Sequence, residues 1–551
     1  MSQFHYIEPP PNWTAEERPT LPGSPATPYH RPAIRLAYAG VSVLVGITGG
    51  LGTALIAANL PQIQGQLGLT PVEGAWLQAA YVMVNVSSNL ILVKFRQQFG
   101  VRRFAELGIA AYVLVTILHV MANDYSTALI ARAVSGFAAA PLTSLGLYYM
   151  MQALPKRHVG AAICVGFAFT QFAVPLAWIL SPPLLDIGDW RGLYLFELGM
   201  ALLSMAAIVI LKLPPGMRIR VFEPLDIVTF LFFAPAIALV AAVLAEGRTE
   251  WWPDQPWMAW ALISALLLFL CAFFVEHHRA RPLIQTRWLA SAEILRFLFG
   301  ALGLRLLLSE QTYAAAGLLR TLGMGPDQLQ GFYAVVLLGT VGGAFLAAAL
   351  FRPDRFIWLL VASVALIVVA GLMDQNATSL TRPSDLYVSQ FIMAFASGLF
   401  IGPLVFLGIG VALSRGTDHV ITLFVLFSIT QSVGGLAGPA LFGTFQQYRE
   451  QEYSAQIVES VDPTDPVVAQ RLQAQNQIYA RFITDPVRRN AAGLQLLSQT
   501  ATREANVRSF NDVVVLNTLM AVVLLVWSLI RAVIRTRAAR HATRTAAKGA
   551  G

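Results

Sequence analysis

Residues 131–150 read ARAVSGFAAAPLTSLGLYYM, a stretch apolar enough to cross a bilayer that nevertheless contains one charged residue, Arg132. A charge at membrane depth costs at least about 2.5–3.5 kcal/mol, so it needs a partner or water, and an intramembrane arginine is a candidate functional residue. Gly136 and Ala140 form a small-residue face that lets a neighbouring helix approach closely. Pro141 is expected to bend or soften this helix. The alternative is an arginine that snorkels at a helix end.

The rest of the chain is equally apolar. Of its 551 residues 56% are hydrophobic and only 12% are charged, about half the fraction of charged residues in soluble domains, which is roughly 25%. A helical span needs about 20 apolar residues. About 14 segments of the chain meet this requirement, which predicts an all-α polytopic membrane protein. These segments are 37–60, 75–95, 104–122, 127–150, 158–181, 191–211, 225–245, 257–275, 295–317, 331–351, 357–373, 386–412, 419–442 and 512–533.

The net charge of +8 is explained by the loops between these segments. Arginine and lysine gather in alternate loops, and basic residues beside membrane spans are enriched on the cytoplasmic side. Both termini are therefore predicted to be cytoplasmic, and no nucleic-acid partner is needed to explain the charge. Cys164 and Cys271 both lie in apolar runs, so no disulfide framework is implied. Residues 1–33 are rich in proline and polar residues and are predicted to form a disordered tail.

The motif RAVSGFAAAPLT resembles the fourth-helix motif of the major facilitator superfamily, in particular the 14-helix drug:proton antiporters of the EmrB type. The resemblance implies two six-helix bundles with a central inserted helix pair, and it places Arg132 in the proton-coupling machinery. The predicted organisation is a tail (1–33), a six-helix bundle (34–212), the inserted pair with its linker (213–290), five helices of the second bundle (291–443), a periplasmic helical loop (444–511), the last span (512–534) and a basic tail (535–551).

Other motifs of that family are eroded. Many members carry an aspartate near the position of Gly52, so proton coupling would need another carboxylate here. The glycine-rich signature of helix five is degraded, and one glycine is replaced by Trp178. The loop VKFRQQFGVRRF keeps Gly100, Arg102 and Arg103 of the superfamily's gating motif but has glutamines at its usual charged positions. Its role as a gate or as a plain basic loop stays open.

Four charged residues inside apolar segments are the proton-coupling candidates. Arg305 and Glu310 are about 140° apart around one helix, so each needs a partner on another helix. At 1.5 Å per residue, Arg132 and Glu197 lie about 9 Å, and Glu310 about 12 Å, below the outer ends of their helices. This similar depth predicts either a shared aqueous site or two separate polar contacts.

The substrate-cavity candidates are polar residues within the spans. They are Asn59, Gln78, Asn85, Gln311, Tyr313, Gln390 and Gln431.

Roughly 65 polar residues separate the last two spans. Asp465–Pro466 and Asp485–Pro486 each have an N-cap residue followed by proline at the first helical position, which predicts two extramembrane helices. The resemblance implies a periplasmic membrane-fusion adaptor and an outer-membrane channel as partners on this side. A helical hairpin that covers the outer mouth of the protein is the alternative.

The sequence contains no Walker-type phosphate-binding motif, and no nucleophile triad or metal site can be argued from it. We therefore expect no enzyme activity, cofactor or metal. The interpretation favoured by the sequence is a proton-coupled exporter of amphipathic or aromatic organic compounds in a bacterial inner membrane. The alternatives are an uptake porter or facilitator for an organic acid, and a membrane scaffold or sensor that transports nothing.

Overall fold

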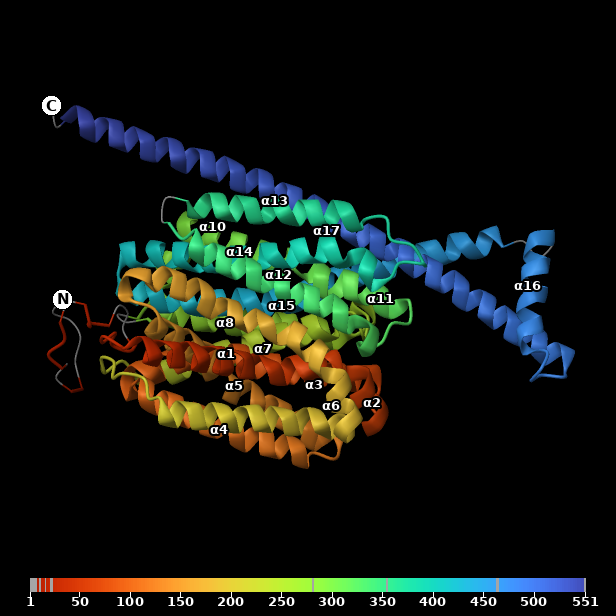
Figure 1. Ribbon diagram of the computed structural model, residues 1–551, viewed down its shortest axis with the longest axis horizontal. Coiled ribbons are helices and arrows are strands. Elements are labelled where there is room, and N and C mark those ends of the chain that lie inside the picture. The colour runs from red at the N-terminus through yellow and green to blue at the C-terminus, as the bar shows by residue number, and fades with distance from the viewer. Residues whose placement is uncertain are drawn as a thin grey trace.

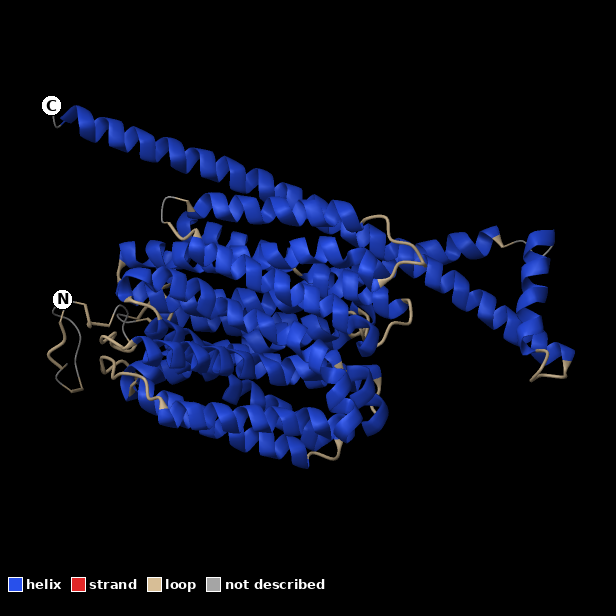
Figure 2. Cartoon of the chain, in the orientation of Figure 1, coloured by secondary structure: helices blue, strands red, loops and turns tan. Residues whose placement is uncertain are grey.

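The computed structural model describes residues 7–8, 11–14, 16–19, 23–279, 282–352, 355–461 and 465–549; the predicted tail falls partly outside these ranges. The described chain is almost wholly helical, and most helices run side by side along one direction (Figures 1 and 2). The N-terminus and the C-terminus lie toward the same end of this bundle (Figure 1). We call this the terminal end, and the other the opposite end.

Six spans form the first half. Its elements are α1 (Pro32–Ala58), α2 (Leu60–Leu67), α3 (Pro71–Phe99), α4 (Val101–Met121), α5 (Tyr125–Ala153), a 3-10 turn (Lys156–His158) and α6 (Val159–Ile210). Capping boxes at Thr70 and Asp124 begin α3 and α5. α6 contains two spans, Lys156–Ile187 and Trp190–Ile210. The chain reverses direction between these two spans, as their contacts with α1 show. Ser181 is hydrogen-bonded to Asn59 at the C-terminal end of α1, whereas the Lys212 carbonyl accepts from Tyr38 near the start of α1.

The inserted pair consists of α7 (Pro224–Glu246) and α8 (Pro256–His277), joined through a 3-10 turn (Trp252–Asp254). α7 packs against both α3 and α8. A short helix, α9 (Thr286–Leu289), follows and leads to the second half. The central pair expected from the sequence is therefore present as two membrane-length helices.

The second half begins with a span that is interrupted. α10 (Ala292–Leu307) is followed by a π-helical segment (Glu310–Ala315) and α11 (Ala316–Thr321). The remaining elements are α12 (Pro326–Ala349), α13 (Phe356–Asp374), a 3-10 turn (Pro383–Leu386), α14 (Tyr387–Arg415), α15 (Thr417–Ser460), α16 (Pro466–Tyr479) and α17 (Pro486–Gly549). In the described chain 13 continuous helical segments are long and apolar enough to span a membrane, and the interrupted one completes the 14 predicted.

Small residues bring the helices together as the sequence suggests. A Cβ added at Gly136 would lie 2.3 Å from the Tyr81 carbonyl oxygen, so α5 approaches α3 through this glycine. In the second half a Cβ at Gly398 would lie 2.3 Å from the Thr340 carbonyl oxygen, which places α14 directly against α12. These close approaches are the packing expected of small-xxx-small faces in membranes.

The segment between the last two spans projects away from the bundle at the opposite end (Figure 1). α16 begins at Pro466 with the Asp465 carboxylate accepting from the Val467 amide at 2.7 Å, as predicted. The second predicted helix also begins at its proline, Pro486, but it is not separate. It runs without a break into the last span, because no proline interrupts the sequence after Pro486. The hairpin formed by α16 and the start of α17 projects away from the bundle, so it does not cover the opposite end (Figure 1).

Residues 24–27, within the predicted tail, contact the helical bundle. Ser24 and Ala26 are buried, and Pro25 forms an isolated bridge with Gly216. Gln152 of α5 donates to the Ala26 carbonyl at 3.0 Å.

Candidate functional site

A cavity of about 220 Å³ lies between the two halves. The first half contributes residues of α3 to α6, among them Asn85, and the second half contributes residues of α14 and α15, among them Gln431. Phenylalanines from both halves, Phe167 and Phe427, meet edge to face in its wall with ring centroids 5.7 Å apart. The lining thus combines aromatic faces with amide and hydroxyl groups and extends toward the terminal end at Arg96, near the end of α3.

The two halves are packed together at the opposite end. The Trp178 indole of α6 stacks on the Tyr333 ring of α12, with centroids 4.8 Å apart and planes only 9° from parallel. The Arg320 guanidinium lies 5.9 Å from the Trp178 ring, and Gln330 donates to the Ile179 carbonyl at 3.1 Å. The side chain that breaks the expected glycine signature therefore forms part of the seal between the halves.

Arg132 is 1% exposed and lies inside the first half. Its Nε donates to the Leu77 carbonyl at 3.2 Å and its Nη2 donates to Thr53 at 3.1 Å, while the guanidinium lies 4.6 Å from the centre of the Tyr81 ring. Its Nη1 has no hydrogen-bond partner in the described structure. Arg132 is thus a buried cation that keeps one donor unused, and it does not snorkel to the surface.

Glu197 lies in the same half and is 2% exposed. Its Oε1 accepts from the Tyr112 hydroxyl at 2.8 Å, and its Oε2 lies 3.9 Å from Nδ1 of His119. Arg132 and Glu197 approach neighbouring residues of α1 from different helices, since Arg132 bonds Thr53 and Glu197 lies against Gly52. No ion pair of 4.0 Å or less joins them in the described structure.

Gly52 has no space for a side chain because the carboxylate of Glu197 fills it. A Cβ at this position would lie 2.1 Å from Oε1 of Glu197 and 2.9 Å from the Tyr112 hydroxyl. The Glu197 carboxylate of α6 therefore occupies the space beside Gly52 of α1.

A second acidic cluster lies in the other half. Gln390 donates from one nitrogen, Nε2, to Asp374 at 2.7 Å and to both oxygens of Glu310 at 3.3 Å. Gln311 in turn donates to the Gln390 side-chain oxygen at 3.1 Å. All three bonded groups, Glu310, Asp374 and Gln390, are buried, and in the described structure neither carboxylate forms an ion pair with a cation. This cluster is therefore two acids held by one amide.

The charged candidates do not share one site. Arg132 and Glu197 belong to the first half and Glu310 to the second, and none of the three lines the central cavity. Of the two arrangements compatible with their similar depth, the structure has two separate polar contacts. Arg305 and Glu310 do not pair, as expected from their angular separation.

Arg305 instead reaches toward α15. Its Nε donates to the Gln431 carbonyl at 3.3 Å, and a Cβ at Gly435 would lie 3.1 Å from its Nη2. The Arg305 guanidinium of α10 therefore lies beside Gln431 of α15. The glycine at 435 leaves room for the guanidinium to pass.

The remaining cavity candidates are dispersed. Asn85 and Gln431 line the cavity, although Asn85 also donates to the Gly136 carbonyl at 2.9 Å. Asn59 links α1 to Ser181 at 2.7 Å, and Tyr313 accepts from Arg248 at 2.8 Å near the opposite end. Gln78 is half-buried outside the cavity lining.

The loop that keeps part of the gating motif has a charge network beside it. Gly100 takes a φ of +87° between α3 and α4, and Arg102 bonds the Leu213 carbonyl at 2.7 Å, whereas Arg103 is exposed. Three residues earlier in the chain than Gln97, Lys94 of α3 bonds both oxygens of Asp226 on α7, at 2.7 and 2.8 Å.

Arg279 completes this network by bonding Asp226 at 2.8 Å, Glu223 at 2.9 Å and Glu276 at 2.7 Å. Burial alone would lower the pKa of Arg279, but the hydrogen bonds that Arg279 donates to the three carboxylates outweigh this effect and raise that pKa. The inserted pair is thus fixed to α3 by buried charges.

Comparison with known proteins places the chain. The profile of the Major Facilitator Superfamily matches residues 42–439. The chain belongs to the major facilitator superfamily. It is 24% identical over 402 residues to the puromycin resistance protein pur8 of Streptomyces alboniger, covering 72% of this chain and 78% of that protein. It is 22% identical over 447 residues to the multidrug export protein EmrB of Haemophilus influenzae, covering 78% and 83%.

The solved structures agree on the fold. The human organic anion transporter MFSD10 (TETRAN) superposes with a TM-score of 0.55 over 88% of this chain and 99% of that one, at 13% identity. As a member of the major facilitator superfamily, the protein is a transporter and not an enzyme.

Two features of this transporter escaped sequence reasoning. Asp374 is the last residue of α13, just beyond the predicted segment 357–373, and it is not among the candidates named from the sequence. Its signal would have been a single acid that ends an otherwise uncharged span. Tyr112 has no local signal at all, because its role depends on Glu197, 85 residues away.

Proposed function

We propose that this protein is a proton-coupled exporter of amphipathic or aromatic organic compounds in a bacterial inner membrane, with both termini in the cytoplasm. The observation that carries the proposal is the Glu197 carboxylate in the space beside Gly52, close to Arg132. In the antiporters that the sequence resembles, an acid on the first helix and the arginine on the fourth belong to the coupling machinery. The same pair of groups is available here from α6 and α5.

The coupling step follows from the contacts of Glu197. An arginine that approaches a carboxylate favours its charged form, whereas burial without a cation favours the protonated form. Arg132 has an unused Nη1 donor and no ion pair, so a small movement of α5 against α6 would change which form of Glu197 is preferred. Protonation of Glu197 would then be linked to the movement of the two halves that alternating access requires.

The cavity supports organic compounds as cargo. Its aromatic rings and amides suit an amphipathic molecule, which needs apolar surface and a few polar groups that fix its orientation. The names of the relatives, a puromycin resistance protein and a multidrug export protein, agree with export of such compounds.

The Glu310–Asp374 cluster is a second place where a proton could bind. Two carboxylates that are hydrogen-bonded to one nitrogen repel each other when both are charged, and a proton removes that repulsion.

The projecting hairpin is proposed to contact a periplasmic membrane-fusion adaptor that leads to an outer-membrane channel. Apolar side chains at its tip, such as Phe482 at 84% exposure, are not covered by any other described residues.

Exchange of the carboxylate between helices tests the proposal. In proteoliposomes with an imposed pH gradient, Glu197→Gln should reduce proton-driven dye efflux to the level without a gradient. Gly52→Asp alone should also fail, because its side chain meets Glu197. The double variant Gly52→Asp/Glu197→Ala returns the acid to α1 and should restore coupled efflux. Glu106→Gln, an acid at the surface, is the control and should keep full activity.

Undiminished efflux by Glu197→Gln would remove this residue from the scheme. Glu310→Gln and Asp374→Asn in the same assay identify the contribution of the second cluster. If all three single variants keep proton-driven efflux, the coupling proposal fails as a whole.

A further inference from the structure

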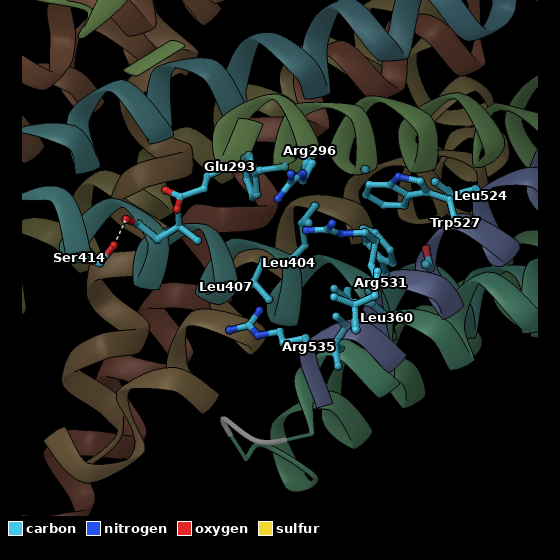
Figure 3. Close-up of a pocket in the computed structure, with 17 residues that line it drawn as sticks. Glu293, Arg296, Leu360, Leu404, Leu407, Ser414, Leu524, Trp527, Arg531 and Arg535 are labelled. Carbon is cyan, nitrogen blue, oxygen red and sulfur yellow. Dashed lines mark hydrogen bonds between the residues drawn. The ribbon is translucent and has the colours of Figure 1, made fainter. Parts of the chain in front are cut away.

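A second cavity, of about 390 Å³, lies within the second half and is separate from the cavity between the halves. It is enclosed by α10, α13, α14 and α17 near their terminal ends (Figure 3). Its volume falls within the range of about 300–1,000 Å³ typical of small-molecule sites. Its wall is mainly apolar and includes Phe297, Leu404, Leu524 and Trp527.

The cavity has a charged rim on one side. Arg296 of α10 and Arg531 and Arg535 of α17 line it, and their side chains turn toward the same hollow (Figure 3). In the described structure none of these arginines pairs with a carboxylate; Glu293, which also lines the cavity, is paired with Arg415 at 3.2 Å.

Three arginines against one glutamate that is already paired leave the lining net positive, and a positive rim beside an apolar cavity is complementary to an anionic amphiphile. Arginine suits phosphate because its planar group can donate two parallel hydrogen bonds to neighbouring oxygens. Basic pockets between membrane helices bind the head groups of anionic phospholipids. The alternative, that these residues are ordinary basic residues beside a span, explains their sign but not their convergence on one cavity.

We propose that this cavity binds an anionic phospholipid, with the phosphate among Arg296, Arg531 and Arg535 and an acyl chain against Phe297, Leu404 and Leu524. Such a lipid contacts both α10 and α17, the first and the last helix of the second half in the sequence. It therefore stabilises the terminal end of that half. The site is distinct from the cavity between the halves and does not depend on the proposed proton coupling.

Thermal unfolding of the purified full chain in detergent, with phospholipid titrated in, tests the proposal. Phosphatidylglycerol should raise the melting temperature of the wild type, and phosphatidylcholine with the same acyl chains should not. The triple variant Arg296→Gln/Arg531→Gln/Arg535→Gln should require a roughly tenfold or higher phosphatidylglycerol concentration for the same shift. The matched control is Arg352→Gln/Arg355→Gln, which removes two arginines outside the cavity lining and should respond as the wild type does.

A second variant keeps the arginines and fills the cavity. Gly300 lines it, and a Cβ there would have only Trp527 within 4 Å, at 3.9 Å, so Gly300→Leu places a side chain in the space for the acyl chain. This variant should also lose the phosphatidylglycerol response. Equal loss in the control, an equal shift with phosphatidylcholine, or the same shift with inorganic phosphate alone would each overturn the proposal, the last by identifying a free-anion site. A full response from Gly300→Leu would do so as well.

Discussion

The buried pair Lys94–Asp226 gives the sharpest stability prediction. The side chains are 9% and 0% exposed, and Asp226 provides the carboxylate that Lys94 contacts. Removing one partner of a buried pair leaves a lone charge and costs about 3–5 kcal/mol. Asp226→Asn should therefore destabilise the protein by about this amount. Lys94→Met should cost less, because Arg279 still pairs with Asp226 at 2.8 Å.

The double variant separates the pair from its surroundings. In Lys94→Met/Asp226→Asn neither side chain carries a charge, and Arg279 keeps Glu223 and Glu276. The double variant should be more stable than the sum of the single losses predicts, with a coupling free energy within the range of about 0.5–3 kcal/mol found for contacting residues. Equilibrium unfolding in mixed detergent micelles, followed by the fluorescence of the 11 tryptophans, measures all four proteins.

An exposed pair is the control for this cycle. Arg508 and Glu504 are 50% and 41% exposed and 3.4 Å apart, so Glu504→Gln should cost no more than about 1 kcal/mol. If Asp226→Asn proves as stable as the wild type, or if the two single effects simply add, the inserted pair is not held to α3 by these charges.

Two further predictions concern single positions in the first half. Trp178→Ala removes the ring stacked on Tyr333 and should favour the conformation that is open at the opposite end. Labelling of the variant Gln330→Cys with a water-soluble maleimide measures this opening. The cysteine should react faster when Trp178 is replaced by alanine than when the native tryptophan is present. Gly52→Ala should lower the melting temperature because its Cβ would lie 2.1 Å from the Glu197 carboxylate. Gly40 is on the same helix, and a Cβ there would have no atom within 4 Å, so Gly40→Ala should leave the melting temperature unchanged or raise it slightly.

The spans could be predicted from the sequence because bilayer thickness imposes their length. Helix starts were predictable for the same kind of local reason, as Asp465–Pro466 illustrates, since a capping side chain and a fixed φ act within a few residues. What followed the starts was less predictable. The helix from Pro486 continues into the last span because the polar segment and the apolar segment are both compatible with one helix, and hydropathy distinguishes only their surroundings.

The partners of the buried charges could not be predicted, because they come from helices far apart in the chain. Depth along a helix follows from residue counting, and it placed Arg132, Glu197 and Glu310 at comparable levels. The direction in which each side chain points around the bundle does not follow from counting. In the structure, Glu310 points toward Gln390 and Asp374. Arg132 points toward Thr53 and Leu77.

Gly52 shows how one helix can leave space for a side chain that another helix supplies. A buried carboxylate needs space and a hydrogen-bond donor. Its ability to bind a proton does not depend on which helix carries it. Here the absence of a Cβ on α1 creates the space, Tyr112 of α4 supplies the donor, and Glu197 of α6 enters. Arg305 beside Gln431 has a similar arrangement in the second half, where Gly435 provides the space. An eroded motif in a packed helical bundle is therefore evidence of lost function only after the neighbouring helices have been searched for the same group.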